Sequence, residues 1–176
     1  MKIFKTKLKD CLIIKPTVFP DHRGFFFESF NKNNFKKNNL ITTFKQDNFS
    51  LSKKNVLRGL HFQKKKPQAK LFYVSYGKVM DVVVDLRKNS KTYLKHQKFI
   101  VSSFNHHQIY IPPGFAHGFL VISKIAYCHY KCTNYYDPKD DGSIAWYDKK
   151  LNINWNIRKP ILSDKDKKGL KLDDIF

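Results

Sequence analysis

The stretch Val79-Met-Asp-Val-Val-Val-Asp-Leu86 predicts a β-strand with two unlike faces. Because alternate side chains point to opposite sides of a strand, one face carries both aspartates and the other is wholly apolar. In a sandwich or barrel one of these faces points to the interior, where a carboxylate is costly unless it is paired. Asp81 or Asp85 is therefore a candidate site residue. The alternative is that both carboxylates face solvent or an arginine.

The sequence on both sides of this strand continues as short apolar runs separated by turn residues, with almost no helical periodicity. This pattern predicts an all-β sandwich or barrel with very little helix. The expected strands are 12–14, 24–30, 42–50, 55–63, 69–76, 78–86, 98–102, 108–111, 117–122 and 126–136. An asparagine cap predicts one helix over 31–38, turns are expected at 112–114 and 137–142, and the tail from residue 164 onward is expected to be short helix or loop.

Length and composition predict one domain that spans residues 1–176. No window approaches the roughly 20 apolar residues of a membrane span, and the first 15 residues lack the apolar core of a secretion signal. The three cysteines are odd in number and match neither a disulfide scaffold nor a Cys-x-x-Cys pair. A cytoplasmic protein with reduced thiols and no membrane partner is expected.

The formal charge of +20 comes almost entirely from lysines that are scattered along the chain. A nucleic-acid-binding protein usually gathers its basic residues in a patch, so nucleic acid is not the expected partner. The excess charge would still draw in an anionic substrate, and a nucleotide diphosphate is one.

The segment Asn55-Val-Leu-Arg-Gly-Leu-His-Phe-Gln63 is the densest in groups that can do chemistry. Strand geometry places His61 and Arg58 on opposite faces unless the strand is twisted or bulged at Gly59. A lone histidine on a strand is more often structural than catalytic. Here Lys70 follows in the next expected strand and His117 follows a rigid turn, and antiparallel pairing would bring these groups together.

Several segments together resemble the dTDP-4-dehydrorhamnose 3,5-epimerase family, a branch of the cupin superfamily, nearly from end to end. They are 19–28, 46–48, 55–63, 68–70, 81–87, 111–119, 130–136 and 162–166. The resemblance implies a double-stranded β-helix jelly roll with a few short helices. It also implies a homodimer that exchanges N-terminal strands, and an enzyme without metal or cofactor.

The resemblance further implies an isomerase that inverts C3 and C5 of a dTDP-linked 4-keto-6-deoxy sugar. Both carbons adjoin the C4 ketone, so loss of either proton gives an enolate whose charge lies on O4. Such chemistry needs a base, a cation near O4 and an acid on the opposite face. A related C3 or C5 epimerase of another nucleotide-linked 4-keto sugar, such as a GDP-heptose, is the open alternative.

By position, the resemblance makes His61 the base, Asp166 the carboxylate that orients it, Lys70 the enolate stabiliser and Tyr130 the proton donor. The substrate-binding positions that it implies are Arg23, Glu28, Gln46, Asp47, Asn48, Arg58, Asp81, His117, Tyr136, Asp141 and Lys165. Two positions depart from the family pattern. Asp141 stands where glutamate is expected, and Ala69 replaces a common glycine.

Two rival interpretations start from the same fold. A metal-dependent cupin needs a His-x-His pair with a carboxylate and a further histidine, and this chain has His61-Phe-Gln63 instead. A sugar-binding module without catalysis would have lost the four catalytic positions, which are all present. The aromatic run Phe25-Phe-Phe27 is expected to pack in the core or at a subunit interface.

Overall fold

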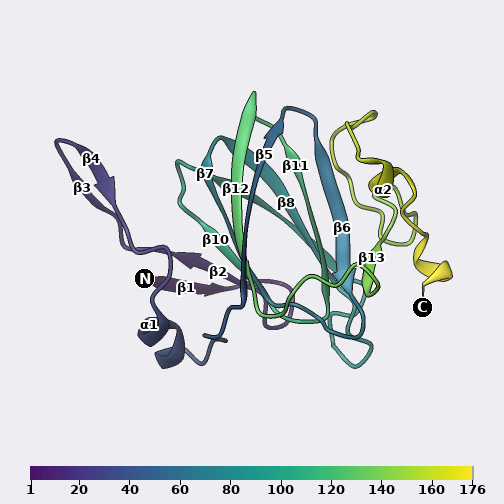
Figure 1. Cartoon of the computed structure of the whole chain (residues 1–176), viewed down its shortest axis with the longest axis horizontal. Coiled ribbons are helices and arrows are strands. Elements are labelled where there is room, and N and C mark those ends of the chain that lie inside the picture. The colour runs from purple at the N-terminus through teal and green to yellow at the C-terminus, as the bar shows by residue number, and fades with distance from the viewer. Residues whose placement is uncertain (176) are drawn as a thin grey trace.

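The computed structural model describes residues 1–175 and forms two β-sheets that face each other (Figure 1). The six-stranded sheet has the order β1 (Lys2–Lys5), β2 (Leu12–Lys15), β10 (Gln108–Ile111), β7 (Lys70–Tyr76), β12 (Ile125–Cys132) and β5 (Gln46–Lys53). The five-stranded sheet has the order β13 (Asp141–Ser143), β6 (Leu57–Gln63), β11 (Phe115–Val121), β8 (Lys78–Asp85) and β9 (His96–Ser102). The all-β jelly roll expected from the sequence is confirmed.

The remaining elements lie outside the two sheets. They are the hairpin of β3 (Phe19–Asp21) and β4 (Gly24–Phe26), helix α1 (Lys32–Lys37), helix α2 (Asp164–Lys167) and the 3₁₀ turn η1 (Leu172–Asp174). The hairpin, called the arm below, projects away from the sheets, whereas α2 and the C-terminal segment lie beside β6 at the other end of the molecule (Figure 1). None of the helices among the described residues is long and apolar enough to cross a membrane.

Several elements at the edges of the sheets were not predicted from the sequence or were predicted with other bounds. Strands β1, β3 and β13 were not expected, the strand expected over 24–30 ends at residue 26, and the strand expected over 42–50 begins at residue 46 and runs to residue 53. The turn expected over 137–142 overlaps the start of β13. Asp-Gly-Ser has low strand propensity, and it forms β13 because it pairs with the edge of β6.

Strand β8 carries the predicted alternation, but both of its faces are buried. Val79 and Val83 pack in the core between the sheets, whereas Val82 and Val84 pack under the C-terminal segment. The aspartates share the inner face and are fully buried. Asp85 accepts hydrogen bonds from Arg87, Ser90 and Thr92, so the expected arginine partner is found for this residue alone.

A register shift in β6 answers the question of how Arg58 and His61 are oriented. His61 pairs with His117 of β11 and Arg58 pairs with Phe119, so three steps along β6 face two steps along β11. The extra residue forms a bulge that turns both side chains to the inner face. Gly59 lies in it with φ +122°, and a Cβ there would stand 2.5 Å from the Gly118 Cα atom.

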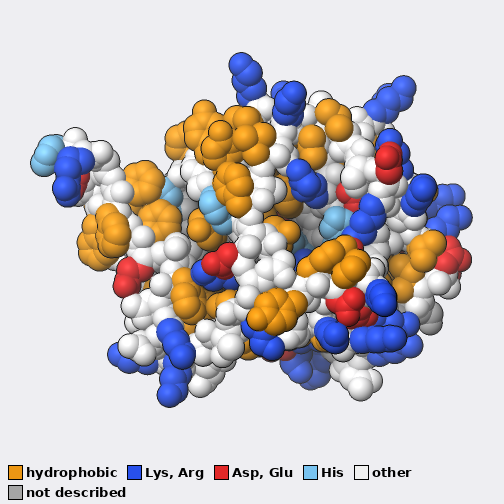
Figure 2. All heavy atoms as spheres, viewed as in Figure 1, with side chains coloured by type: hydrophobic (Ala, Val, Ile, Leu, Met, Phe, Trp, Pro, Cys, Tyr) orange, Lys and Arg blue, Asp and Glu red, His pale blue; other side chains and the backbone are white. Residues whose placement is uncertain are grey.

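Two exposed aromatic surfaces stand out. On the outer face of β5, β7 and β12, Phe49, Leu51 and Tyr76 are exposed, and the rings of Tyr73 and His129 stack 5.0 Å apart. We call this surface the aromatic face, and Figure 2 shows apolar side chains gathered over β5 and β12.

On the arm, Phe19, Phe25 and Phe26 are also exposed, with more than half of each side chain open to solvent. The sequence predicts Phe25-Phe-Phe27 either in the core or at a subunit interface. Phe25 and Phe26 are not in the core of this chain. The cysteines Cys11, Cys128 and Cys132 are free and buried.

Candidate active site

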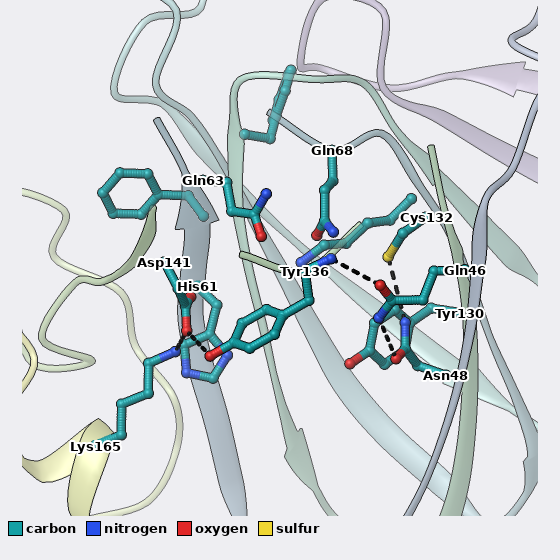
Figure 3. Close-up of a pocket in the computed structure, with 13 residues that line it drawn as sticks. Gln46, Asn48, His61, Gln63, Gln68, Tyr130, Cys132, Tyr136, Asp141 and Lys165 are labelled. Carbon is teal, nitrogen blue, oxygen red and sulfur yellow. Dashed lines mark hydrogen bonds and ion pairs between the residues drawn. The ribbon is translucent and has the colours of Figure 1, made fainter. Parts of the chain in front are cut away.

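A polar cavity of about 320 Å³ opens between the two sheets near α2 and β13. In the close-up of Figure 3, His61 stands on one side of the cavity and Tyr130 on the other. His61 comes from β6 of the five-stranded sheet, whereas Tyr130 comes from β12 of the six-stranded sheet. The lining residues are Gln46, Asn48, His61, Phe62, Gln63, Gln68, Lys70, Phe115, Tyr130, Cys132, Tyr136, Asp141 and Lys165.

His61 forms a close pair with Asp166 of α2. The Nε2 atom of His61 lies 2.5 Å from Oδ1 of Asp166, and Ser163 donates to the other carboxylate oxygen at 2.8 Å. Burial alone would raise the pKa of Asp166, but the hydrogen bonds from His61 and Ser163 hold it below its ordinary value. An ionised carboxylate in this position orients the imidazole and stabilises its protonated form. His61 is therefore equipped to act as a base.

Lys70 and Tyr130 lie across the cavity from His61 and provide a cation and an acid. The ammonium of Lys70 is 5.8 Å from the centre of the Tyr130 ring. Burial raises the pKa of Tyr130, so its hydroxyl is protonated at neutral pH. Burial lowers the pKa of Lys70, and nearby acidic groups oppose that shift. An ammonium beside an oxygen that gains charge is the usual means of stabilising an enolate.

The rim of the cavity is held by hydrogen bonds around Asp141. The Tyr136 hydroxyl donates to this carboxylate at 2.8 Å, and the Lys165 ammonium contacts the same oxygen. The Tyr136 backbone N–H also donates to Gln46 at 2.8 Å, and Gln46 in turn contacts Asn48 at 2.9 Å. These five side chains join β5, β13, α2 and the loop after β12 around one opening (Figure 3).

Asp81 and His117 form a second histidine–carboxylate pair, but they do not line the cavity. His117 Nε2 lies 2.5 Å from Oδ1 of Asp81, and both side chains are buried. Burial lowers the pKa of His117, so its ring is neutral at pH 7. The pair lies in the core behind His61, which is the register partner of His117.

Other predicted residues lie away from the cavity of this chain. Arg23 and Glu28 are on or just after the arm, and Arg23 forms an exposed ion pair with Asp21 at 2.6 Å. Asp47 points to the outer side of β5, where it pairs with Lys131. Arg58 reaches the inner face, but its Nε donates to Ser52 rather than entering the cavity.

Sequence reasoning missed three polar lining residues, Gln63, Gln68 and Cys132. Each is two positions from a predicted catalytic residue on the same strand or at its start. Because side chains two apart share a face, extending each predicted position by two residues would have found all three. Ser163, which supports Asp166, carries no comparable strand signal.

The metal-dependent interpretation needs a cluster of ligands. Among residues 1–175, no group of three or more histidine, cysteine, aspartate or glutamate side chains is placed to hold a metal ion.

A jelly roll with a polar cavity between its sheets, lined by a histidine–aspartate pair, a lysine and a tyrosine, defines a cupin-like enzyme with acid–base groups. The family model described as dTDP-4-dehydrorhamnose 3,5-epimerase matches residues 5–174. The chain belongs to this family of isomerases.

Individual relatives agree with the family. The dTDP-4-dehydrorhamnose 3,5-epimerase of Escherichia coli is 47% identical over 179 residues, with 100% of this chain and 97% of the relative covered. The Legionella pneumophila enzyme, solved in complex with dTDP-4-keto-L-rhamnose, is 44% identical with a TM-score of 0.95, covering 99% of this chain and 94% of that one. A 3'-monoepimerase from Streptomyces bikiniensis, solved with dTDP-quinovose, is 27% identical with a TM-score of 0.90, covering 96% and 86%.

Proposed function

We propose that this chain converts dTDP-4-dehydro-6-deoxy-D-glucose to dTDP-4-dehydro-L-rhamnose by inverting C3 and C5. The observation that carries the proposal is the position of His61 and Tyr130 on opposite sides of one cavity, with Lys70 beside Tyr130. Inversion requires a proton to leave one face of a carbon and return to the other, which two groups placed in this way can accomplish.

The proposed reaction runs in two proton transfers at each carbon. His61 takes the proton next to the C4 ketone, and the electron pair moves to O4, where the Lys70 ammonium stabilises the enolate. Tyr130 then gives its proton to the opposite face of the carbon. Its tyrosinate regains a proton from solvent, and the His61 imidazolium, held by Asp166, releases one.

The nucleotide is proposed to bind at the rim of the cavity. The exposed ring of Tyr136 offers a surface for the thymine, and the Lys165 ammonium offers charge to the diphosphate. Gln46 and Asn48 supply hydrogen bonds beside them. Arg58, on the inner face of β6, is one candidate for a guanidinium contact with the diphosphate.

We also propose that the active protein is a cytoplasmic homodimer that exchanges its N-terminal strands. The arm carries Arg23 and Glu28 away from the cavity of its own chain, and it exposes three phenylalanines. The aromatic face is a second surface that a partner would cover. Exchange would bring Arg23 and Glu28 to the partner's cavity. The proposed product feeds rhamnose-containing surface polysaccharides such as O-antigen or capsule.

The test is incubation with dTDP-4-keto-6-deoxyglucose in heavy water, followed by NMR at C3 and C5. The proposal expects deuterium at both carbons and appearance of the L-rhamno product. Exchange and inversion at C3 alone, or at C5 alone, would assign a narrower epimerase. No exchange at either carbon, with turnover of a GDP-linked 4-keto sugar instead, would overturn the nucleotide and the sugar.

Two variants assign the roles of the facing residues. His61→Asn is expected to abolish exchange at both carbons, because no base remains. Tyr130→Phe is expected to permit abstraction of the proton while blocking inversion. Normal exchange in His61→Asn would show that another residue is the base.

A further inference from the structure

The Gln63 side chain lines the cavity, but its amide is bound to the backbone of two loops. Its Nε2 group donates to the carbonyl oxygens of Lys66 at 2.9 Å and of Tyr135 at 3.3 Å. Its Oε1 atom accepts the backbone N–H of Asp137 at 2.9 Å. Both amide hydrogens therefore have protein acceptors, and the side chain is buried. A buried amide that is satisfied in this way holds its backbone partners in place.

These hydrogen bonds fall on both sides of Tyr136. The carbonyl of Tyr135 and the N–H of Tyr136 belong to one peptide unit, and the N–H of Asp137 belongs to the next. Gln63 binds the first unit at its carbonyl and the second at its N–H. Gln46, from the opposite sheet, accepts the Tyr136 N–H at 2.8 Å. Rotation of the backbone at Tyr136 would therefore break at least one of these bonds.

The Tyr136 ring is held at its far end as well. Its hydroxyl donates to Asp141 at 2.8 Å, and Figure 3 shows this bond together with the one to Gln46. The residue is nevertheless 54% exposed. An exposed tyrosine on a loop normally keeps several rotamers and loses that freedom when it binds a ligand. Tyr136 is open to solvent and yet held in one orientation, as a preformed stacking surface requires.

A further set of hydrogen bonds joins the two loops that Gln63 contacts. The Asp140 carboxylate accepts the backbone N–H groups of Lys64, Lys65 and Lys66 at 3.1, 2.7 and 2.7 Å. The loop between β6 and β7 is thereby attached to the loop between β12 and β13. The Lys66 carbonyl that accepts the Gln63 amide is thus part of an anchored turn, and Gln63 lies between two loops that are fixed to each other.

We propose that Gln63 is a positioning residue that holds Tyr136 in the orientation in which it stacks on a nucleobase. This role rests on the proposed function, in which Tyr136 receives the thymine of the substrate. Because Gln63 follows His61 by two positions on β6, one strand would set the position of both the base and the nucleobase surface. It also gives a role to the residue at which this chain departs from the His-x-His pair of a metal-dependent cupin.

The first test measures the binding of dTDP alone by isothermal titration calorimetry. Gln63→Met keeps nearly the same length and volume but removes all three hydrogen bonds of the amide. Its Kd for dTDP is expected to rise about tenfold, because base–aromatic stacking changes affinity by roughly 5- to 150-fold and a loosened ring loses part of that. An unchanged Kd in Gln63→Met would overturn the inference.

A double-mutant cycle shows whether Gln63 acts through Tyr136. If it does, Gln63→Met should change the Kd for dTDP by less than about twofold when Tyr136 is already replaced by alanine. A tenfold rise with and without the Tyr136 ring would show that Gln63 affects dTDP by another route, and the positioning role would be wrong.

Asn134→Ala is the matched control. The Asn134 amide also ties the two loops, since its Nδ2 group donates to the Pro67 carbonyl at 2.9 Å, but it binds neither peptide unit beside Tyr136. Its Kd for dTDP is expected to stay within about twofold of wild type. A rise equal to that of Gln63→Met would show that any loss of contact between the loops has the same effect, against a specific role for Gln63.

Amide hydrogen exchange followed by NMR tests the geometry without any ligand. In the wild-type protein the N–H groups of Tyr136 and Asp137 should exchange at least about tenfold more slowly than in an unfolded chain, because each has a side-chain acceptor. In Gln63→Met the protection of Asp137 should be lost while that of the β12 amides is kept. If Gln63→Met does not fold, the wild-type measurement decides, since unprotected exchange at Asp137 would show that the contact is not maintained.

Kinetics with the dTDP-keto sugar separate a positioning role from a role in the chemistry. In Gln63→Met the KM should rise by about the same factor as the Kd for dTDP, with kcat within about threefold of wild type. A fall in kcat at unchanged KM would place Gln63 in the proton-transfer step and overturn the inference. Binding of dTDP without turnover of the sugar would overturn only the proposed reaction, whereas absence of dTDP binding in the wild-type protein would overturn both.

Discussion

The cavity and the arm differ in how fully a single chain pairs their strands and covers or fixes their side chains. The strands that carry His61, Lys70 and Tyr130 are paired on both sides, and the His61 ring is fixed by Asp166. The two strands of the arm pair only with each other, and Phe19, Phe25 and Phe26 are exposed. The comparison fits the proposed function, in which one chain holds the groups for proton transfer and the arm completes the binding surface of a second chain.

The largest effect is expected from Asp166, the carboxylate that contacts the proposed base His61. Asp166→Asn should lower kcat by about 10²- to 10⁴-fold, because the amide neither holds the correct tautomer of His61 nor stabilises its protonated form. Steady-state rates with the dTDP-keto sugar measure this. The matched control is Asp164→Asn on the same helix, where the carboxylate is exposed and pairs with Lys167. A kcat within threefold of wild type in Asp166→Asn would contradict the assignment of the pair.

A second prediction compares two glycines that both have positive φ. Gly59→Ala in β6 should destabilise the fold by about 3 kcal/mol or more, because its Cβ would meet the Gly118 backbone at 2.5 Å in addition to the backbone strain. Gly24→Ala on the arm, at φ +134°, has no atom within 4 Å of its Cβ and should cost only about 1 kcal/mol. Urea unfolding measures both. Equal losses would show that the close approach at the bulge is unimportant.

The bulge also marks a limit of what sequence can predict. The alternation of β8 and the bounds of β10 follow from local pattern, and the sequence predicted both. The side of β6 on which Arg58 lies depends on an extra residue opposite β11. Strand alternation alone could not show that this residue is present, so the sequence predicted only that Arg58 and His61 lie on opposite faces unless the strand is twisted or bulged. Strand β1 was missed because it is only four residues long and has a lysine at each end, which gives a weak core signal, and it forms by pairing with β2.

The site shows the same limit at longer range. His61 and Asp166 are 105 positions apart in sequence, and no local pattern joins them. The pairing was expected only from the family resemblance. By contrast, the inward direction of Lys70 and Tyr130 follows from strand alternation once the core face is known.

A third prediction addresses the arm. Arg23→Ala should raise KM by about 10- to 100-fold while leaving kcat nearly unchanged, because a guanidinium that binds the diphosphate contributes equally before and during the reaction. His22→Ala, at the neighbouring position on the tip of the arm, is the control and should behave as wild type. An unchanged KM in Arg23→Ala would remove the arm from the binding site.

Mixed dimers show whether the arm serves its own chain or its partner. If arms are exchanged, a dimer of one His61→Asn chain and one Arg23→Ala chain contains one site with both His61 and Arg23 intact. Mixing the two variants should therefore restore turnover with the wild-type KM at up to half of the sites. No such component in the mixture would show that each arm serves the cavity of its own chain.

The smallest effect is expected from Ser163, whose hydroxyl supports the Asp166 carboxylate. Ser163 accepts the backbone N–H of Asp166 at 3.1 Å and donates to its carboxylate at 2.8 Å. Ser163→Ala should lower the free energy of unfolding by about 1 kcal/mol and kcat by less than about tenfold, since the His61 contact remains. Ser163→Thr keeps the hydroxyl and should restore both values.

The pH dependence of Ser163→Ala has a definite sign. The folded-state pKa of Asp166 lies below its ordinary value, so its stabilisation is present above the unfolded pKa and is lost as pH falls through the folded one. Without the Ser163 donor the folded-state pKa of Asp166 rises, and acid unfolding should begin at a higher pH, as thermal unfolding across pH 3 to 7 would show.

Because Ser163 and Asp166 belong to one chain, the difference in kcat between Ser163→Ala and wild type should not depend on protein concentration. If arms are exchanged in the proposed dimer, the KM effect of Arg23→Ala should disappear under dilution that dissociates it, since wild type would then lose the same contact. A Ser163→Ala defect in kcat that changed with dilution would contradict the view that the proton-transfer half of the site is complete within one chain.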